Sequence, residues 1–318
     1  MFFDDIGSFP LPKGISRGWI ERNLYSKEYE ELVQRAFLMK AKYVEVPNYP
    51  QFRDMVSMFM DLIKNKELQD DAYLISKRYA KIVELEIVEK MDVESVRVCI
   101  TGPFELYYKE FGGKIYEDVL LNLAESVKRF AKNASKYENV KCISIDEPSL
   151  GLAPDLQPEK EILERAFDYK VGCDVQIHLH SPIFYNKLLE TGIDVVGVEA
   201  AKEQKNLSLL DPEMLRSYDK KVRVGVARSD IDGIVAEFNA KYNLNAWKSE
   251  ELIEMAVEEV EPFEEIRSRI FRAYEIFEDL IAYIGPDCGL FSFPTQSSAL
   301  KLLSNIRKAL EEVRKWII

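Results

Sequence analysis

The sequence has only four cysteines, two histidines and fewer basic than acidic residues. The cysteines are too few and too scattered for a disulfide scaffold, which favours a reducing, cytoplasmic setting. With 43 Lys and Arg against 55 Asp and Glu, the net charge is −12. A polyanion such as DNA would be repelled, because nucleic-acid affinity depends on neutralising phosphates. We therefore expect no nucleic-acid partner.

Long apolar runs are also missing. No stretch approaches the ~18 consecutive apolar residues that span a bilayer, and Met1–Asp5 does not have the basic start of a signal peptide. We therefore expect no membrane partner. No linker rich in Gly, Ser or Pro divides the 318 residues, and 47% of them are hydrophobic, which is typical of a globular protein. The length allows two domains or one α/β barrel.

Alternation of two kinds of segment predicts the fold. Short runs rich in β-branched residues alternate with amphipathic stretches, a pattern typical of a parallel sheet. The expected strands are Phe2–Ile6, Lys42–Val46, Val96–Thr101, Val140–Ile145, Asp174–His178, Asp194–Val198, Val222–Ala227 and Ile281–Pro286. The expected helices are Tyr29–Lys40, Asp71–Lys90, Tyr116–Lys136, Glu159–Tyr169, Ile183–Thr191, Glu250–Leu280 and Ser297–Trp316. Eight strand–helix units predict one (β/α)8 TIM barrel over residues 1–318, with insertions at 47–94 and 228–280. A doubly wound sheet would normally need fewer strands.

Both histidines stand at the end of one expected strand. His178 and His180 are two positions apart, so their side chains point to the same side of the strand. In a barrel the active site lies at the carboxyl ends of the strands, and imidazole is the commonest metal ligand. The alternative is a polar pair that stacks in the barrel mouth.

Two other strand ends carry further metal-ligating residues. Glu199 follows the apolar run 195–198 and is either a ligand or the partner of a cation. Cys288 lies in a turn rich in Gly and Pro, where backbone amides can favour a thiolate; an inert thiol is the alternative. Nitrogen, oxygen and sulfur donors together suit Zn2+ better than magnesium or calcium.

The remaining strand ends offer groups that bind substrate. Asp146 and Glu147 close the fourth expected strand; adjacent side chains point to opposite faces, and we favour Asp146 as the one facing the substrate. The turn Ile6-Gly7-Ser8 offers free amides for a carboxylate. Thr101-Gly102-Pro103 is more typical of a simple turn.

These blocks, in this order, resemble the catalytic barrel of the cobalamin-independent methionine synthase family. The matching residues are Ile6–Pro10, Asp54–Val56, Thr101–Pro103, Ile145–Pro148, Ile177–His180, Glu199 and Pro286–Leu290. The resemblance implies methyl transfer to the thiol of homocysteine and a zinc ion held by His180, Glu199 and Cys288. Pro182 stands where the family has its first cysteine, so His178 or water would complete the set. By the same resemblance Ile6, Gly7 and Ser8 hold the homocysteine carboxylate, and Asp146 holds the amino group.

Two further positions depart from the family pattern. Gln51 stands where the family has a Glu that helps hold the amino group, and an amide can hydrogen-bond an ammonium without neutralising it. The family uses a histidine after strand seven to assist the leaving group. Here Arg228 is nearest in register and Asp230 is the nearest acid, so we expect Asp230 to be catalytic, together with Asp146.

The methyl donor follows only from the resemblance. The chain is similar to short forms that lack a second, folate-binding barrel, which favours a methyl-corrinoid donor, such as methylcobalamin or a corrinoid protein, over methyl-folate or methyl-pterin. One alternative acceptor is coenzyme M, which lacks an α-amino group and would not need Asp146. Another alternative is a non-catalytic zinc- or thiol-binding subunit of a methyltransferase system. Amidohydrolase barrels also carry a His-x-His pair, but they need further histidines that this chain lacks.

Overall fold

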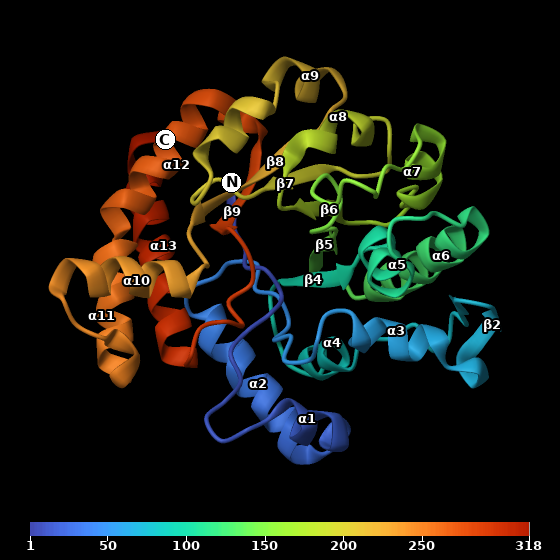
Figure 1. Cartoon of the computed structure of the whole chain (residues 1–318), viewed down its shortest axis with the longest axis horizontal. Coiled ribbons are helices and arrows are strands. Elements are labelled where there is room, and N and C mark those ends of the chain that lie inside the picture. Colours follow the sequence, from blue (N-terminus) through green and yellow to red (C-terminus); the bar gives the residue numbers. More distant parts are fainter. Residues whose placement is uncertain (318) are drawn as a thin grey trace.

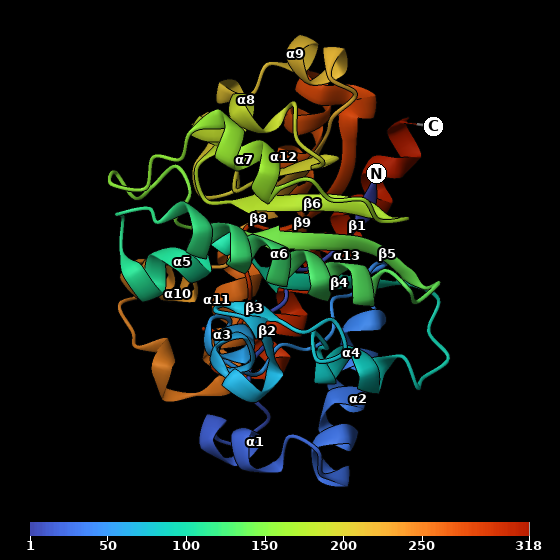
Figure 2. The ribbon, with the colours of Figure 1, turned by 90° about the vertical axis from the view of Figure 1, so that its right-hand side faces the viewer.

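The fold is built around a curled sheet of seven parallel strands. The computed structural model describes residues 1–317. The strand order is β1-β9-β8-β7-β6-β5-β4. The bounds are β1 (Phe2–Phe3), β4 (Val96–Thr101), β5 (Val140–Asp146), β6 (Asp174–Leu179), β7 (Val195–Val198), β8 (Lys221–Ala227) and β9 (Ile281–Pro286). Figure 1 looks onto the face at which these strands end, and Figure 2 shows both chain termini on the opposite side.

Helices cover the outer face of the sheet. In α6 (Glu117–Ala134) the spaced residues Leu120, Leu123, Val127 and Phe130 are buried, as their helical periodicity predicts. The other α-helices are α1 (Arg17–Asn23), α2 (Lys27–Ala41), α3 (Ser57–Lys64), α4 (Val83–Val88), α5 (Pro103–Phe111), α7 (Lys160–Ala166), α8 (Tyr185–Leu188), α9 (Pro212–Ser217), α10 (Ile231–Tyr242), α11 (Glu250–Val260), α12 (Phe263–Phe277) and α13 (Gln296–Ile317). Because helices cover the sheet, its strands are nearly continuous apolar runs. None of the helices described is long and apolar enough to cross a membrane.

Seven of the eight expected strands are present, and the second, at 42–46, is not a strand. Residues 46–51, which we call the bridging segment, instead make isolated parallel bridges: Asp4 with Val46, Asn48 with Arg97, and Ser8 with Gln51. Pro47 and Pro50 lie in this segment, and proline cannot donate to a regular ladder. The segment thus bridges both edge strands, while the sheet itself has seven strands.

Two expected helices are wrong in extent. The range 71–90 contains only α4 as a helix and begins at a hairpin of β2 (Gln69–Asp71) and β3 (Leu74–Ile75). The expected helix 250–280 is divided into α11 and α12 at Pro262, because proline has no N–H for the helical hydrogen bond.

The sheet encloses a polar layer below the strand ends. Asp4 lies between two buried arginines: its Oδ1 is 2.9 Å from Arg223 Nε and its Oδ2 is 3.2 Å from Arg97 Nε. Arg97 also donates to Gln176 Oε1 at 2.7 Å. A Cβ at Gly285 would lie 2.5 Å from an Arg223 nitrogen, so the glycine makes room for this network.

Candidate metal centre

Four side chains predicted as metal ligands meet at the carboxyl ends of β6, β7 and β9. The donor atoms of His178, His180, Glu199 and Cys288, which we call the donor set, all lie within 4.8 Å of one another. His180 Nε2 is 3.3 Å from Glu199 Oε1 and 3.7 Å from Cys288 Sγ, and His178 Nε2 is 3.9 Å from Glu199 Oε1. Two consecutive strands and a third strand much later in the sequence therefore bring together one compact N/O/S group, in which Cys288 is 108 positions from His180.

His178 is a buried imidazole with free nitrogens. The residue is 2% exposed, and neither ring nitrogen has a hydrogen-bond partner among residues 1–317. Burial, then the neighbouring His180, and then the positive charges of Arg223 and Arg97 hold the pKa of His178 well below its usual range. Burial also lowers the pKa of His180. Both rings are thus neutral near pH 7 and have a lone pair to offer, and an orphaned buried polar group is costly unless something binds it.

Glu199 and Cys288 hold their protons more tightly than usual. Burial, and then the charge of Asp287, raises the pKa of Glu199 to about 8. Burial, and then the charge of Glu199, raises the pKa of the Cys288 thiol to about 12. A divalent cation would reverse both shifts. Among residues 1–317, Glu199 forms ion-pair contacts only with the two histidines of the donor set, and the chemistry of the four donors fits zinc.

Asp287 orients the donor set without belonging to it. Its Oδ1 accepts the backbone N–H groups of Ala200 and Ala201 at 2.9 Å, and its Oδ2 accepts that of Lys202 at 2.8 Å. The segment that follows Glu199 is therefore tied to the residue that precedes Cys288. Sequence reasoning assigned no role to Asp287; its place beside Cys288 was the available signal.

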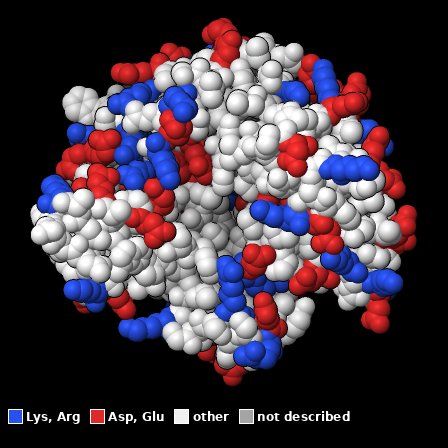
Figure 3. Space-filling view, in the orientation of Figure 1, with Lys and Arg blue, Asp and Glu red and all other residues white. Residues whose placement is uncertain are grey.

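A cavity of about 260 Å³ opens beside the donor set, and Figure 3 shows this face hollowed near its centre. Four residues that the sequence predicts to bind substrate line this cavity: Ile6, Ser8, Gln51 and Asp146. Gly7 does not line the cavity, but a Cβ there would lie 2.7 Å from Gln51 Oε1. Four of the predicted substrate residues thus line the same cavity as His178, His180 and Cys288 of the donor set.

Asp146 is fixed from within the sheet. Its Oδ1 accepts the Ser144 hydroxyl at 2.7 Å, and its Oδ2 contacts the Cys99 thiol. Burial raises its pKa. The neighbouring Glu147 points to the other face and accepts the backbone N–H groups of Phe104 and Glu105 at 3.0 and 2.7 Å. The two adjacent carboxyl groups therefore face different surroundings, and only Asp146 borders the cavity.

Asp230, predicted to be catalytic, does not line this cavity. It forms ion pairs with Arg228 at 3.0 Å and with Lys202 at 3.1 Å. Burial opposes its ionisation, but the two cations outweigh burial and lower the pKa of Asp230. An ionised carboxylate is not a proton donor, so this conformation does not support the acid role, which stays a prediction. Pro182 begins a 3-10 helix and carries no ligand atom.

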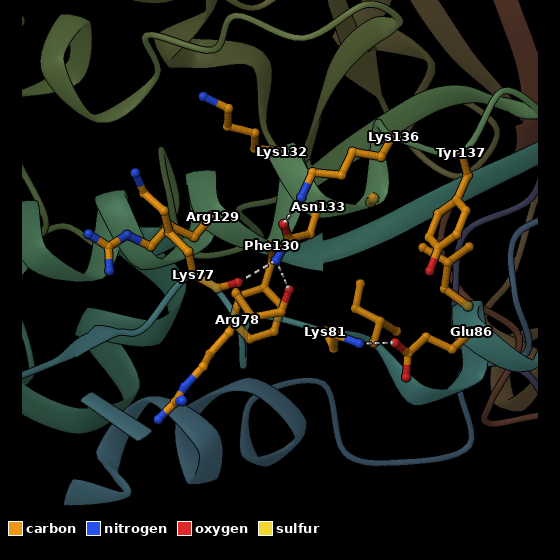
Figure 4. Close-up of a pocket in the computed structure, with 14 residues that line it drawn as sticks. Lys77, Arg78, Lys81, Glu86, Arg129, Phe130, Lys132, Asn133, Lys136 and Tyr137 are labelled. Carbon is orange, nitrogen blue, oxygen red and sulfur yellow. Dashed lines mark hydrogen bonds and ion pairs between the residues drawn. The ribbon is translucent and has the colours of Figure 1, made fainter. Parts of the chain in front are cut away.

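A larger groove of about 560 Å³ lies elsewhere, between α6 and the segment 77–86 (Figure 4). Its rim carries lysines and arginines from both segments, and Lys81 is paired with Glu86 at 2.8 Å. None of the predicted site residues lines it. The volume of a hollow therefore does not identify the functional site. The predicted site residues line the smaller cavity beside the donor set.

The fold and the donor set define an α/β protein with a candidate metal centre at the strand ends. No protein-family model matches the chain. Methionine synthase of Sulfolobus acidocaldarius is 24% identical over 233 residues, which cover 70% of this chain and only 59% of that protein. Methionine synthase of Methanothermobacter thermautotrophicus is 26% identical over 281 residues, which cover 80% of each chain. A trigger factor of Caldicellulosiruptor saccharolyticus is 25% identical over 223 residues, 65% of this chain and 50% of that protein.

Two solved structures resemble the chain in fold. A B12-independent methionine synthase from Shewanella sp. W3-18-1, in complex with selenomethionine, has a TM-score of 0.62 at 14% identity and covers 99% of this chain and 98% of its own. A methyltransferase from Methanosarcina mazei has a TM-score of 0.54 at 11% identity, with coverages of 98% and 94%. The fold agrees with the methionine synthase matches. The resemblance to the cobalamin-independent methionine synthase family, in a short form similar to its catalytic barrel, is confirmed.

Proposed function

We propose that the protein is a zinc-dependent methyltransferase that transfers a methyl group to the thiol of homocysteine and forms methionine. The observation that carries the proposal is the meeting of the donor set with a cavity of amino-acid size. The resemblance to methionine synthases supports the same reaction. The methyl donor that we favour is a methyl-corrinoid, with a methyl-pterin or methyl-folate as the other donor class.

The donor set would hold the metal. We propose that His178 completes the set with His180, Glu199 and Cys288, in place of the thiolate that Pro182 cannot supply. A zinc ion bound there supplies the Lewis acidity that keeps an acceptor thiol deprotonated near neutral pH. The low pKa of the buried His178 keeps its lone pair available for this role.

The cavity walls would orient the acceptor. The turn Ile6–Ser8 binds the carboxylate through its amides, and Asp146 and Gln51 bind the ammonium group. Because Ser144 and Cys99 already fix the Asp146 carboxyl, little of its freedom is lost when substrate binds. The acceptor sulfur then faces the donor methyl, and the new carbon–sulfur bond forms as the bond from the methyl group to its donor breaks.

One observation favours a second acceptor. The Gln51 amide nitrogen faces Met58 Sδ at 2.8 Å, and a neutral amide leaves Asp146 to neutralise an ammonium group alone. A thiol without an amino group, such as coenzyme M, needs neither residue.

The cysteines bear on the compartment in which the protein acts. We place it in the cytoplasm, because all four cysteines are free and disulfides are rare in reducing compartments. We further propose that the bridging segment 46–51 serves as the eighth member of a closed barrel, so that residues 1–318 form one catalytic unit.

The experiment measures metal content and methyl transfer together. Wild type is assayed with homocysteine or coenzyme M as acceptor, and with methylcobalamin or methyl-folate as donor. The variants His180→Ala and Cys288→Ala should lose zinc and methyl transfer, whereas the control Cys173→Ala should keep both. The proposal fails if both ligand variants retain zinc and transfer. Wild type that binds zinc and homocysteine but turns over no donor would be a non-catalytic subunit.

A further inference from the structure

Arg17 places an unpaired guanidinium at the wall of the cavity beside the donor set. It is the first residue of α1, and it lines this cavity together with Phe291. The other arginine of the wall, Arg53, is bound by both oxygens of the buried Glu84 at 2.7 and 2.8 Å. No carboxylate of the described chain lies within ion-pair distance of Arg17. Arg17 is thus the wall cation still free to bind an anion.

Phe291 holds the Arg17 guanidinium in an orientation that suits an oxyanion. The Arg17 Cζ lies 4.2 Å from the centre of the Phe291 ring, a cation–π contact that orients the guanidinium and leaves its edge donors free. Such a fork of N–H groups matches the oxygens of a carboxylate or sulfonate.

The same wall contains the amide turn that is proposed to bind a carboxylate. A Cβ at Gly289 would lie 3.1 Å from Ser8 Cβ and 3.4 Å from Ser8 N. The turn at residues 6–8 therefore packs directly against the turn that carries Phe291. This packing puts a neutral set of amides and a free cation on one side of the cavity, while Asp146 borders it as well.

We infer that Arg17 recognises the anionic group of the acceptor, a carboxylate or a sulfonate, and so selects acidic thiols over neutral ones. The inference rests on the proposed function and adds the charge that its amide turn lacks. Amides of the turn orient the anion, and Arg17 neutralises it. Arg17 is a specificity-determining residue and takes no part in bond formation.

The inference can be tested by the binding of methionine, the product of the proposed reaction. Methionine has no thiol that a metal ion would deprotonate, so the test does not depend on metal chemistry. Calorimetry compares methionine with methioninol, which has an alcohol in place of the carboxylate. In Arg17→Gln the Kd for methionine should rise about tenfold, equivalent to about 1.4 kcal/mol, while the Kd for methioninol stays unchanged. Arg17→Lys should recover part of the loss. The matched control Arg22→Gln, on the same helix, should bind both ligands as wild type does.

A third ligand distinguishes failure of the Arg17 inference from failure of the homocysteine proposal. If the methyl thioether of coenzyme M binds and methionine does not, and that binding depends on Arg17, the inference holds and the homocysteine proposal fails. An unchanged methionine Kd in Arg17→Gln overturns the inference. An equal loss for methionine and methioninol also overturns it, because the effect is then not on the anion. It fails as well if wild type binds none of these ligands.

Discussion

Zinc binding should release a defined number of protons from the donor set. Glu199, with a pKa of about 8, is about nine-tenths protonated at pH 7, and Cys288, with a pKa of about 12, is fully protonated. Both imidazoles are already neutral, because burial lowers their pKa values. Metal ligands bind as carboxylate and thiolate. We therefore expect zinc binding at pH 7 to release about two protons, one from each acid.

The sign of the pH dependence follows from these two pKa values. Below pH 8 two protons must leave, so the apparent zinc affinity should rise about 100-fold per pH unit. Above pH 8 Glu199 is ionised in advance, and only the Cys288 proton is displaced. The rise should then fall to about tenfold per unit. At pH 9 the count of released protons should be about one.

Calorimetry in buffers of different ionisation enthalpy measures this count directly. Glu199→Gln and Cys288→Ser should each release about one proton fewer than wild type at pH 7. Cys173→Ser is the matched control, because its thiol pKa is also raised, to about 11, outside the donor set; this variant should behave as wild type. Zinc binding that releases no proton between pH 6 and 9, or equally many in all variants, would refute the assignment of these ligands.

Three further predictions concern the interior and the cavity. Gly285→Ala should lower the free energy of unfolding by about 1–3 kcal/mol in urea, because its Cβ would press on Arg223; unchanged stability would contradict the close packing. Lys40→Met should cost about 3–5 kcal/mol, because it removes one partner of the buried ion pair with Asp5 at 2.7 Å; a loss below about 1 kcal/mol would contradict this account of the pair. Asp146→Asn should raise KM for homocysteine and leave KM for coenzyme M unchanged, and equal effects in steady-state assays would contradict its role with the ammonium.

The sequence predicted most of the sheet because buried parallel strands appear as β-branched runs. Val96–Thr101 and Ile281–Pro286 are strands with the bounds expected of them. The expected helix 71–90 was wrong because its apolar residues also suit a hairpin, which turns at Tyr73 with a φ of 58°. Local spacing does not distinguish these two structures when the hairpin is held by contacts from elsewhere: Ser126 of α6 receives the Ile75 N–H at 2.9 Å.

The donor set was predictable because rare residue types stood at strand ends. The sequence contains only two histidines, and a glutamate and a cysteine in a Gly/Pro turn follow other strands. Because parallel strands end at one face of a barrel, this is enough to predict that the four side chains meet. The polar layer beneath was not predictable. Asp4 and Arg223 are 219 positions apart, and no periodicity relates an acid just after the first strand to a base in a later strand. The backbone hydrogen bonds of Asp287 escaped prediction for the same reason.

The polar layer makes sense as part of the site rather than as a source of stability. Arg97 and Arg223 share one carboxylate, Asp4, and the charges of both arginines act on His178 of the donor set. Buried ion networks can often be replaced by apolar residues without loss of stability. Stability therefore does not explain why this network lies directly beneath the donor set. Burial lowers the pKa of His178, and both arginines lower it further. Burial raises the pKa of Glu199, whereas Arg223 lowers it. Arg97 and Arg223 thus favour a neutral imidazole at His178, and Arg223 also favours an ionised carboxylate at Glu199. These are the two protonation states that a metal ion requires of such ligands.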